Sequence, residues 1–114
     1  MRAEKRGHWA ETQTAWLLRL TGHRILARNY KTPVGEIDLI AKRGNTVSFI
    51  EVKARADSQA AAEAITPKQR RRIQRAAEMY LVHHPALQTH DIRFDVCLVS
   101  GSFRLKILRD AWRP

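Results

Sequence analysis

Three acidic side chains and a lysine lie in a short part of the chain that otherwise has the composition of buried strands. Glu36 and Asp38 alternate with apolar residues in GEIDLIA, and Glu51 and Lys53 do so in FIEVKAR. Carboxylate oxygens suit Mg²⁺, which often takes only one or two of them and keeps several waters. A nearby ammonium can orient water and offset charge that develops on phosphorus. These residue types therefore fit the hydrolysis of phosphodiester bonds.

A hairpin would bring these side chains together. Residues 36–41 and 47–54 have strand patterns, and Gly44 and Asn45 between them suit a two-residue turn. The resulting register pairs Arg43 with Thr46, Ala41 with Ser48, Asp38 with Glu51, and Glu36 with Lys53. The four charged side chains then share one face, because alternate strand residues point the same way. The opposite, core-facing surface would carry Ile37, Leu39, Ala41, Ser48, Ile50 and Val52.

The spacing leaves two interpretations of the charged face open. Asp38 directly opposite Glu51 is destabilising unless a counter-charge is present, and a divalent cation would supply one. Mg²⁺ or Mn²⁺ is then the expected cofactor, with these two acids as ligands and Lys53 beside them. Alternatively, Glu36 pairs with Lys53 and the other acids only solvate an exposed hairpin. An aspartate and an E-x-K are short, common patterns, so spacing does not decide between the two.

The segments before and after the hairpin predict its supporting elements. Residues 8–21 have a helical pattern in which Trp9, Trp16 and Leu20 form a stripe expected to face the core. RILARNY predicts a strand, and DIRFDVCLV and FRLKIL predict two more with a turn at SGS. The single cysteine, Cys97, lies in one of these apolar runs and is expected to be a small buried side chain.

A second helix is expected after an alanine-rich connection at residues 56–65. Thr66, Pro67 and Gln69 have the residue types of a capping box with proline at the first helical position, and the helix should run out near HHP. The predicted order is helix, three strands, helix and two strands. This order is typical of a mixed α/β domain with a sheet between helices.

The charge of the chain favours a polyanionic partner. Its 21 lysines and arginines against 11 aspartates and glutamates give a formal net charge of +10. Nucleic acid is the commonest partner for such an excess. The basic flank of the second helix would contact backbone phosphates through Lys68, Arg71, Arg72 and Arg75, with Lys68 and Arg72 the first choices. A merely solvated basic helix is the alternative, and no pattern for sequence-specific readout is present.

Length and hydropathy limit the remaining possibilities. The 114 residues suit one domain covering residues 1–114, and 44% hydrophobic content is enough for a packed core. No apolar run approaches the roughly 20 residues of a membrane-spanning helix. The first residues, MRAEKRGHWAE, lack the apolar core of a secretory signal. We therefore expect a soluble cytoplasmic protein with no membrane partner.

GEIDLIA and FIEVKAR together resemble the core motif of the PD-(D/E)xK nuclease superfamily. Within it, nearly the whole chain resembles the YraN family of bacterial proteins, through AETQTAWLLRLTGHRILARNY, GEIDLIA, FIEVKAR, RFDV and ILRDAW. This resemblance implies a restriction-endonuclease-like three-layer α/β/α core with a mixed central sheet. It also implies metal-dependent cleavage of nucleic acid with Asp38, Glu51 and Lys53 as the active positions. Glu11 matches an acid that related junction-resolving nucleases use as a further metal ligand or to orient one.

The expected function is therefore a metal-dependent nuclease, and the resemblance favours DNA, with structured or branched DNA included. A homodimer of so small a domain could cut both strands of a duplex. One alternative is a nucleic-acid-binding or partner-recruiting module without catalysis on the same fold. Another is an interaction protein whose acidic face contacts a basic partner; weak nucleic-acid affinity at physiological salt would distinguish it.

Overall fold

The computed structural model describes residues 3–54, 65–99 and 105–113, with side chains from Trp9 onward. The elements are α1 (Ala3–Leu20), β1 (Arg24–Thr32), β2 (Gly35–Arg43), β3 (Thr46–Ala54), α3 (Pro67–Val82), the short 3₁₀ helix η1 (Pro85–Leu87), β4 (Asp91–Val99) and β5 (Leu105–Trp112). The predicted order of helices and strands is confirmed. The expected alanine-rich connection at 56–64 and the turn at 100–102 lie outside the described residues.

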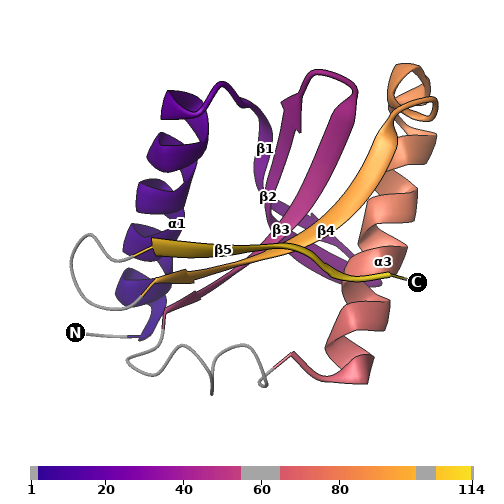
Figure 1. The fold of residues 1–114 in the computed structure, drawn as a ribbon. Helices are drawn as coiled ribbons and strands as arrows, with labels where there is room; N and C mark the ends of the chain where they lie inside the picture. The colour runs from indigo at the N-terminus through magenta and orange to yellow at the C-terminus, as the bar shows by residue number, and fades with distance from the viewer. Residues whose placement is uncertain (1–2, 55–64, 100–104, 114) are drawn as a thin grey trace.

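The strands form one mixed sheet in the order β1-β2-β3-β4-β5. β3 and β4 are parallel, and the other neighbouring strands are antiparallel. α1 packs on one face of the sheet and α3 on the other, which gives three layers (Figure 1). This mixed α/β architecture is compatible with the expected restriction-endonuclease-like core. No helix in the described part of the chain is both long enough and apolar enough to cross a bilayer.

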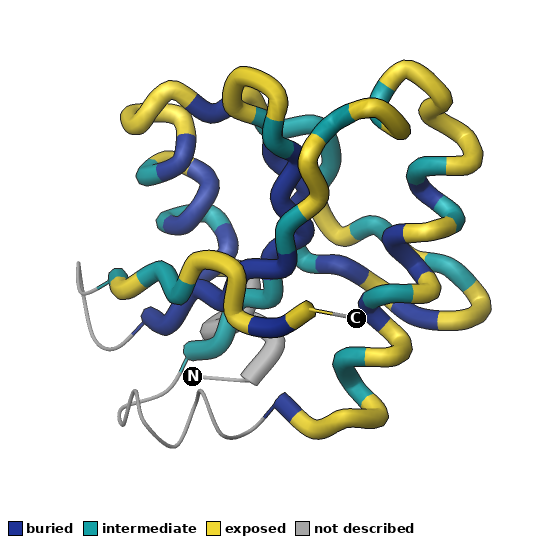
Figure 2. The backbone as a smooth tube through the Cα atoms, turned by 45° about the vertical axis from the view of Figure 1, so that its right-hand side comes forward, coloured by how far each residue is buried: buried dark blue, intermediate teal, exposed yellow. Residues whose placement is uncertain are grey.

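Each face of the sheet has its own apolar core, and the buried backbone runs through the central strands (Figure 2). The α3 side is rich in aromatic residues: Phe49 stacks on Phe94 with 5.7 Å between ring centroids, and Phe94 stacks on Trp112 at 5.2 Å. The α1 side is aliphatic and includes Cys97. The predicted burial of Cys97 is confirmed, and its Sγ accepts a hydrogen bond from the Thr14 hydroxyl at 3.2 Å.

The orientation of α1 corrects one expectation. Trp9 and Trp16 are 44% and 59% exposed, so the aromatic stripe does not face the core. A helix presents one stripe to a sheet, and here that stripe consists mostly of small residues: Ala10, Glu11, Thr14, Ala15 and Leu18. Small side chains let the helix lie close to the strands. Arg19 lies over the outward-facing Trp16 ring at 5.5 Å.

The β2–β3 hairpin has the predicted turn and register. Its turn residues are Gly44, with φ of +58°, and Asn45, and its paired residues run from Arg43↔Thr46 to Leu39↔Ile50. The predicted single apolar face of β2 is wrong at one position. Ile37 packs in the core beneath α3, whereas Leu39 packs in the core beneath α1. The alternation of faces is therefore interrupted between Ile37 and Leu39. The neighbouring β1 contains Asn29 in a left-handed conformation, with φ of +50°.

The start of α3 is fixed by a cap and by a close backbone contact. The Thr66 hydroxyl accepts a hydrogen bond from the Gln69 N–H at 3.1 Å, and Pro67 opens the helix, as predicted. Gly35, at the start of β2, lies against the α3 backbone. A Cβ atom there would overlap the carbonyl oxygen of Arg72. Glycine therefore lets α3 approach the end of the hairpin that carries the acidic residues.

Candidate active site

The acidic residues lie where the β2–β3 ladder opens. The last described pair is Leu39↔Ile50, and Asp38 then replaces a ladder carbonyl: its Oδ2 accepts a hydrogen bond from the Val52 N–H at 2.8 Å. The predicted pairing of Asp38 with Glu51 and of Glu36 with Lys53 is therefore not continued as backbone pairs. The side chain of Asp38 is held rigidly by a strand that also carries Glu51.

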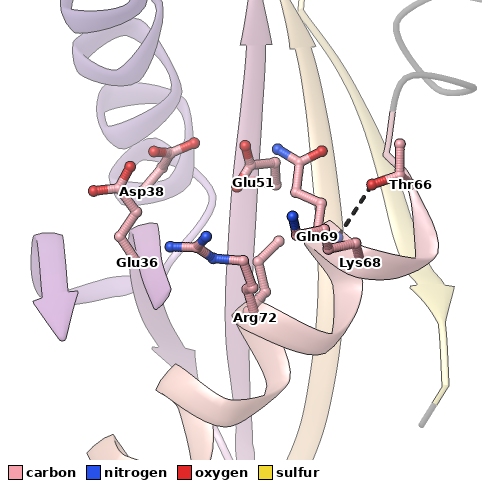
Figure 3. Close-up of a pocket in the computed structure, with 8 residues that line it drawn as sticks. Glu36, Asp38, Glu51, Thr66, Lys68, Gln69 and Arg72 are labelled. Carbon is pink, nitrogen blue, oxygen red and sulfur yellow. Dashed lines mark hydrogen bonds between the residues drawn. The ribbon is translucent and has the colours of Figure 1, made fainter. Parts of the chain in front are cut away.

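A pocket of about 330 Å³ lies between this end of the hairpin and the first turns of α3. Its lining residues are Glu36, Asp38, Glu51, Thr66, Lys68, Gln69, Arg72 and Ile73. Figure 3 shows the acidic side chains on the strand side, and Arg72 extending from α3 toward Glu36 and Asp38. The pocket thus has a carboxylate wall from the sheet and a polar, basic wall from the helix.

Glu51 is the most perturbed acid of this wall. Burial raises its pKa to about 7, and the neighbouring charge of Asp38 contributes to the increase. Lys53 opposes the shift: its Nζ lies 3.4 Å from Glu51 Oε1, and both side chains are largely buried. This ion pair replaces the alternative pairing of Lys53 with Glu36. Lys53 is beside the pocket and does not line it.

Asp38 is perturbed in the same direction. Burial raises its pKa, and the negative charges of Glu11 and Glu36 raise it further, whereas the Val52 N–H and Lys53 favour the charged form. α1 thus brings Glu11 close enough to influence Asp38 electrostatically. Glu11 therefore lies on the side of α1 that faces the hairpin acids.

Glu11 itself is already held by protein groups. It is 4% exposed, and its Oε1 accepts hydrogen bonds from Arg28 Nε at 3.2 Å and from Asn29 Nδ2 at 3.0 Å. The left-handed backbone of Asn29 is therefore tied to the same carboxylate. A role for Glu11 as a metal ligand stays a prediction, and its observed contacts are those of a residue that anchors α1 to β1.

The donor set suits a cation that needs few protein ligands. Among the described residues, no three His, Cys, Asp or Glu side chains come together as a metal-binding group. Asp38 and Glu51 supply two carboxylates whose pKa values are both raised, chiefly by burial, and repulsion from Asp38 adds to the shift of Glu51. A divalent cation would remove that repulsion, and Mg²⁺ is commonly held by one or two carboxylates and waters. The pair therefore fits Mg²⁺ or Mn²⁺ and does not fit an all-protein metal cage.

The basic residues predicted on α3 divide into two groups. Lys68 and Arg72, the first choices for phosphate contact, line the pocket. Arg71 is exposed and does not line it, and Arg75 lies farther along the helix beside a second, apolar pocket. The four residues therefore do not converge on one point. Two face the acidic wall and two continue along the helix.

Sequence reasoning missed Gln69 as a pocket residue. It was assigned to a capping box, but in the described part of the chain only the Thr66 half of that box forms. The Gln69 side-chain amide lies in the pocket instead (Figure 3). The signal available was its position one turn from Arg72, on the side of the helix that follows the E-x-K strand.

Comparison with known proteins places the chain in a family. The model of Uncharacterised protein family UPF0102 matches residues 10–99. The chain belongs to the UPF0102 family. A UPF0102 protein of Parvibaculum lavamentivorans is 48% identical over 112 residues, which are 98% of this chain and 84% of the relative. One from Rhodopseudomonas palustris is 52% identical over 91 residues, 80% of this chain and 70% of the relative. The resemblance to the YraN family is confirmed.

The UPF0102 match contains every residue of the candidate site. It begins in α1 just before Glu11, includes the hairpin with Asp38, Glu51 and Lys53, and continues through α3 to the end of β4. β5 lies beyond the matched residues. The part of the fold that builds the pocket is therefore the part that the family model describes.

Proposed function

We propose that this protein is a metal-dependent nuclease that hydrolyses phosphodiester bonds of nucleic acid. One observation carries the proposal: a single pocket joins two buried, mutually repelling carboxylates with Lys68 and Arg72 on the facing helix. The two carboxylates suit a metal ion, and the two basic side chains suit a nucleic-acid phosphate. Within the described residues Lys53 forms its ion pair with Glu51, which leaves Asp38 without a cation in direct contact.

Asp38 and Glu51 are the residues that would hold Mg²⁺ or Mn²⁺. Such an ion, when bound, supplies polarisation of phosphate oxygens and a water of lowered pKa. The protein contributes rigid placement, because Asp38 is fixed by the Val52 N–H and Glu51 lies on the adjacent strand. Lys53, whose Nζ lies 3.4 Å from Glu51 Oε1, would orient the attacking water and offset charge on phosphorus.

The helix side of the pocket would hold the substrate. Lys68 and Arg72 would contact the phosphates that flank the scissile bond, and the N-terminus of α3 adds its partial positive charge. Arg71 and Arg75 would contact further phosphates of the nucleic-acid backbone and would not recognise bases. Family resemblance favours DNA, including branched forms, as the substrate. The cytoplasmic location stays a prediction.

A second candidate is a nucleic-acid-binding module without catalysis. The Lys53–Glu51 ion pair favours it, because the lysine supplies a counter-charge to Glu51 without any metal. In that case the pocket would be a charge-balanced surface, and α3 would provide all affinity. Binding would then be independent of metal and of Asp38.

The deciding experiment compares cleavage by wild type, Asp38→Asn and Lys53→Met, with Asp91→Asn as a control acid that is exposed at the start of β4. End-labelled duplex, single-stranded, flap, junction and RNA substrates are incubated with Mg²⁺, Mn²⁺ or EDTA. We expect metal-dependent cleavage by wild type and the control, and a loss of at least about 100-fold in both site variants. Equal binding by all four proteins without any cleavage would reject the nuclease and favour the binding module.

A further inference from the structure

A second polar pocket lies at the other end of the β2–β3 hairpin, on the face covered by α1. It is lined by His23, Arg43, Thr46, Ser48 and Arg93 and has a volume of about 30 Å³. None of these residues lines the carboxylate pocket. The lining contains no acid, two hydroxyl groups, two guanidinium groups and one imidazole.

The guanidinium groups of Arg93 and Arg43 are fixed by hydrogen bonds to other protein groups. Arg93 donates from Nε and Nη2 to Asp95, and from Nη2 to the Ser48 hydroxyl, each at 3.2 Å. Arg43 donates from Nη1 to the Thr21 carbonyl oxygen at 3.2 Å. Arg93 Nη1 and Arg43 Nη2 have no hydrogen-bond partner among the described residues. Preorganised donors of this kind bind an anion without first losing side-chain freedom.

His23 completes the set. It is 7% exposed, and its Nδ1 lies 3.1 Å from the Leu18 carbonyl oxygen and 3.2 Å from the Thr21 hydroxyl. Donation from Nδ1 to Leu18 leaves Nε2 free of any partner within the described chain. Burial lowers the pKa of His23, and Arg43, Arg109 and Arg93 lower it further. Positive charge from β2, β4 and β5 therefore converges on this ring.

We propose that this pocket binds a single phosphate-type oxyanion through Arg43, Arg93 and His23. The volume is enough for about two water molecules, so it admits one small oxyanion and excludes a nucleobase. Asp95 neutralises one guanidinium, and the free N–H groups of Arg43 and Arg93 match the acceptor oxygens of phosphate or sulfate. His23 Nε2 is an acceptor in the neutral ring and becomes a donor to the anion when the ring is protonated. The site is independent of the proposed nuclease chemistry, since it needs neither a metal nor the carboxylate pocket.

The same chemistry could come from free phosphate or from a phosphate group of a nucleic acid. Inorganic phosphate at constant ionic strength is titrated into ¹⁵N-labelled protein in EDTA, and NMR shifts of the Thr46 and Ser48 amides and the His23 ring are followed. Oligonucleotides with a 5′-phosphate or a 5′-hydroxyl form the second arm. Arg43-dependent binding of both oligonucleotides indicates internal phosphates, and binding of the 5′-phosphate form alone indicates strand ends.

Arg43→Ala is the test variant because it removes an exposed side chain and leaves the Arg93–Asp95 pair intact. Arg24→Ala removes the same charge from an exposed residue outside the pocket. We expect saturable shifts in wild type, affinity about tenfold weaker in Arg43→Ala, and a change below about twofold in Arg24→Ala. Sulfate keeps its charge between about pH 5 and 8, and it should bind more tightly as the pH falls below the ordinary histidine pKa of 6.5, because the bound anion favours the protonated His23 ring.

Two results would overturn the proposal. One is a linear, unsaturable response of the pocket amides to inorganic phosphate. The other is an equal loss of phosphate affinity in Arg43→Ala and Arg24→Ala, which would show a general charge effect of the basic surface. His23→Gln provides an independent check, because it should abolish the pH dependence of sulfate binding while the folded NMR spectrum is retained.

Discussion

Asp95 on β4 and Glu51 on β3 are largely buried acids on neighbouring strands of the sheet. The charges around the two carboxylates differ. Asp95 on β4 is 2% exposed and accepts hydrogen bonds from Arg93 Nε and Nη2 at 3.2 Å and from the Asp110 N–H at 2.8 Å. Glu51 on the adjacent β3 has one cation, Lys53, at 3.4 Å and two like charges, Asp38 and Glu36, as electrostatic neighbours. The charge of Asp95 is thus compensated by its partners, whereas the charges of Asp38 and Glu51 are only partly compensated by Lys53.

The difference separates a structural acid from a candidate functional one. A buried carboxylate is costly unless it is paired and hydrogen-bonded, and Asp95 meets both conditions. Burial and Asp38 instead raise the pKa of Glu51 to about 7. Such an arrangement destabilises the metal-free protein and persists where a ligand supplies the missing charge. The contrast can be tested through stability, without an assay of activity.

Replacement of Asp95 should have the largest effect. Asp95→Ala leaves the Arg93 guanidinium and the Asp110 N–H without their acceptor, and we expect a loss of about 3 to 5 kcal/mol in the free energy of unfolding. Urea denaturation measures the loss. Asp95→Asn, which keeps an acceptor oxygen, should lose less, and the exposed Asp91→Ala should change stability by under about 0.5 kcal/mol. A loss for Asp95→Ala no greater than the Asp91→Ala effect would contradict the structural role.

Replacement of Glu51 should act in the opposite direction. The folded-state pKa of about 7 lies above the ordinary value of 4.5, so the contribution of Glu51 to metal-free stability is greatest below pH 4.5 and is lost as pH rises through 7. The full loss is on the order of 3 kcal/mol. Glu51→Gln removes it, and the unpairing of Lys53 reduces the gain, so we expect about 1 to 3 kcal/mol of stabilisation at pH 8.

The pH dependence of that gain is its own control. Urea denaturation in EDTA at pH 4 should show little difference between Glu51→Gln and wild type, since Glu51 is then protonated in both folded and unfolded states. Glu78→Gln on the exposed side of α3 should show no gain at either pH. If Glu51→Gln is destabilised at pH 8 by as much as Asp95→Ala, the two acids are alike and the contrast fails.

The part of the site that was predictable from sequence is the part determined by local structure. Strand alternation and a two-residue turn place Asp38 near Glu51 and Lys53 beside it, and the observed register from Arg43↔Thr46 to Leu39↔Ile50 agrees. The α3 start followed from Thr66 and Pro67 for the same reason, because a cap depends on adjacent residues.

The rest depends on tertiary packing that single-segment patterns do not encode. The hydrophobic pattern of α1 favoured Trp9 and Trp16 as the inward stripe, but close packing selected the small stripe through Ala10 and Ala15. The packing of Ile37 beneath α3 required knowledge of which helix covers that end of β2. The position of Gln69 in the pocket required the approach of α3 to Gly35. None of these is visible from residue spacing within one element.

The close contact between α3 and Gly35 can be tested with the substitution Gly35→Ala. The added methyl group overlaps the Arg72 carbonyl oxygen and lies 2.8 Å from its carbonyl carbon, so α3 must shift away from the hairpin. We expect a loss of about 1 to 3 kcal/mol in urea denaturation. Gly44→Ala is the control: no atom lies within 4 Å of the new methyl group, and its φ of +58° alone should cost about 1 kcal/mol. An unshifted α3, seen as unchanged Arg72 and Ile73 amide resonances in Gly35→Ala, would contradict the close contact.

The smallest expected effect is that of Mg²⁺ on thermal stability. An ion bound between Asp38 and Glu51 should stabilise the protein by about 1.4 kcal/mol at ten times its dissociation constant, which raises the melting temperature at pH 8 by several degrees. Near pH 5.5 the rise should disappear, because Glu51 holds its proton below a pKa of about 7. Asp38→Asn should remove the rise at pH 8, whereas Asp91→Asn should retain it. A rise that persists in Asp38→Asn would place the ion elsewhere and leave the two acids without the charge that distinguishes them from Asp95.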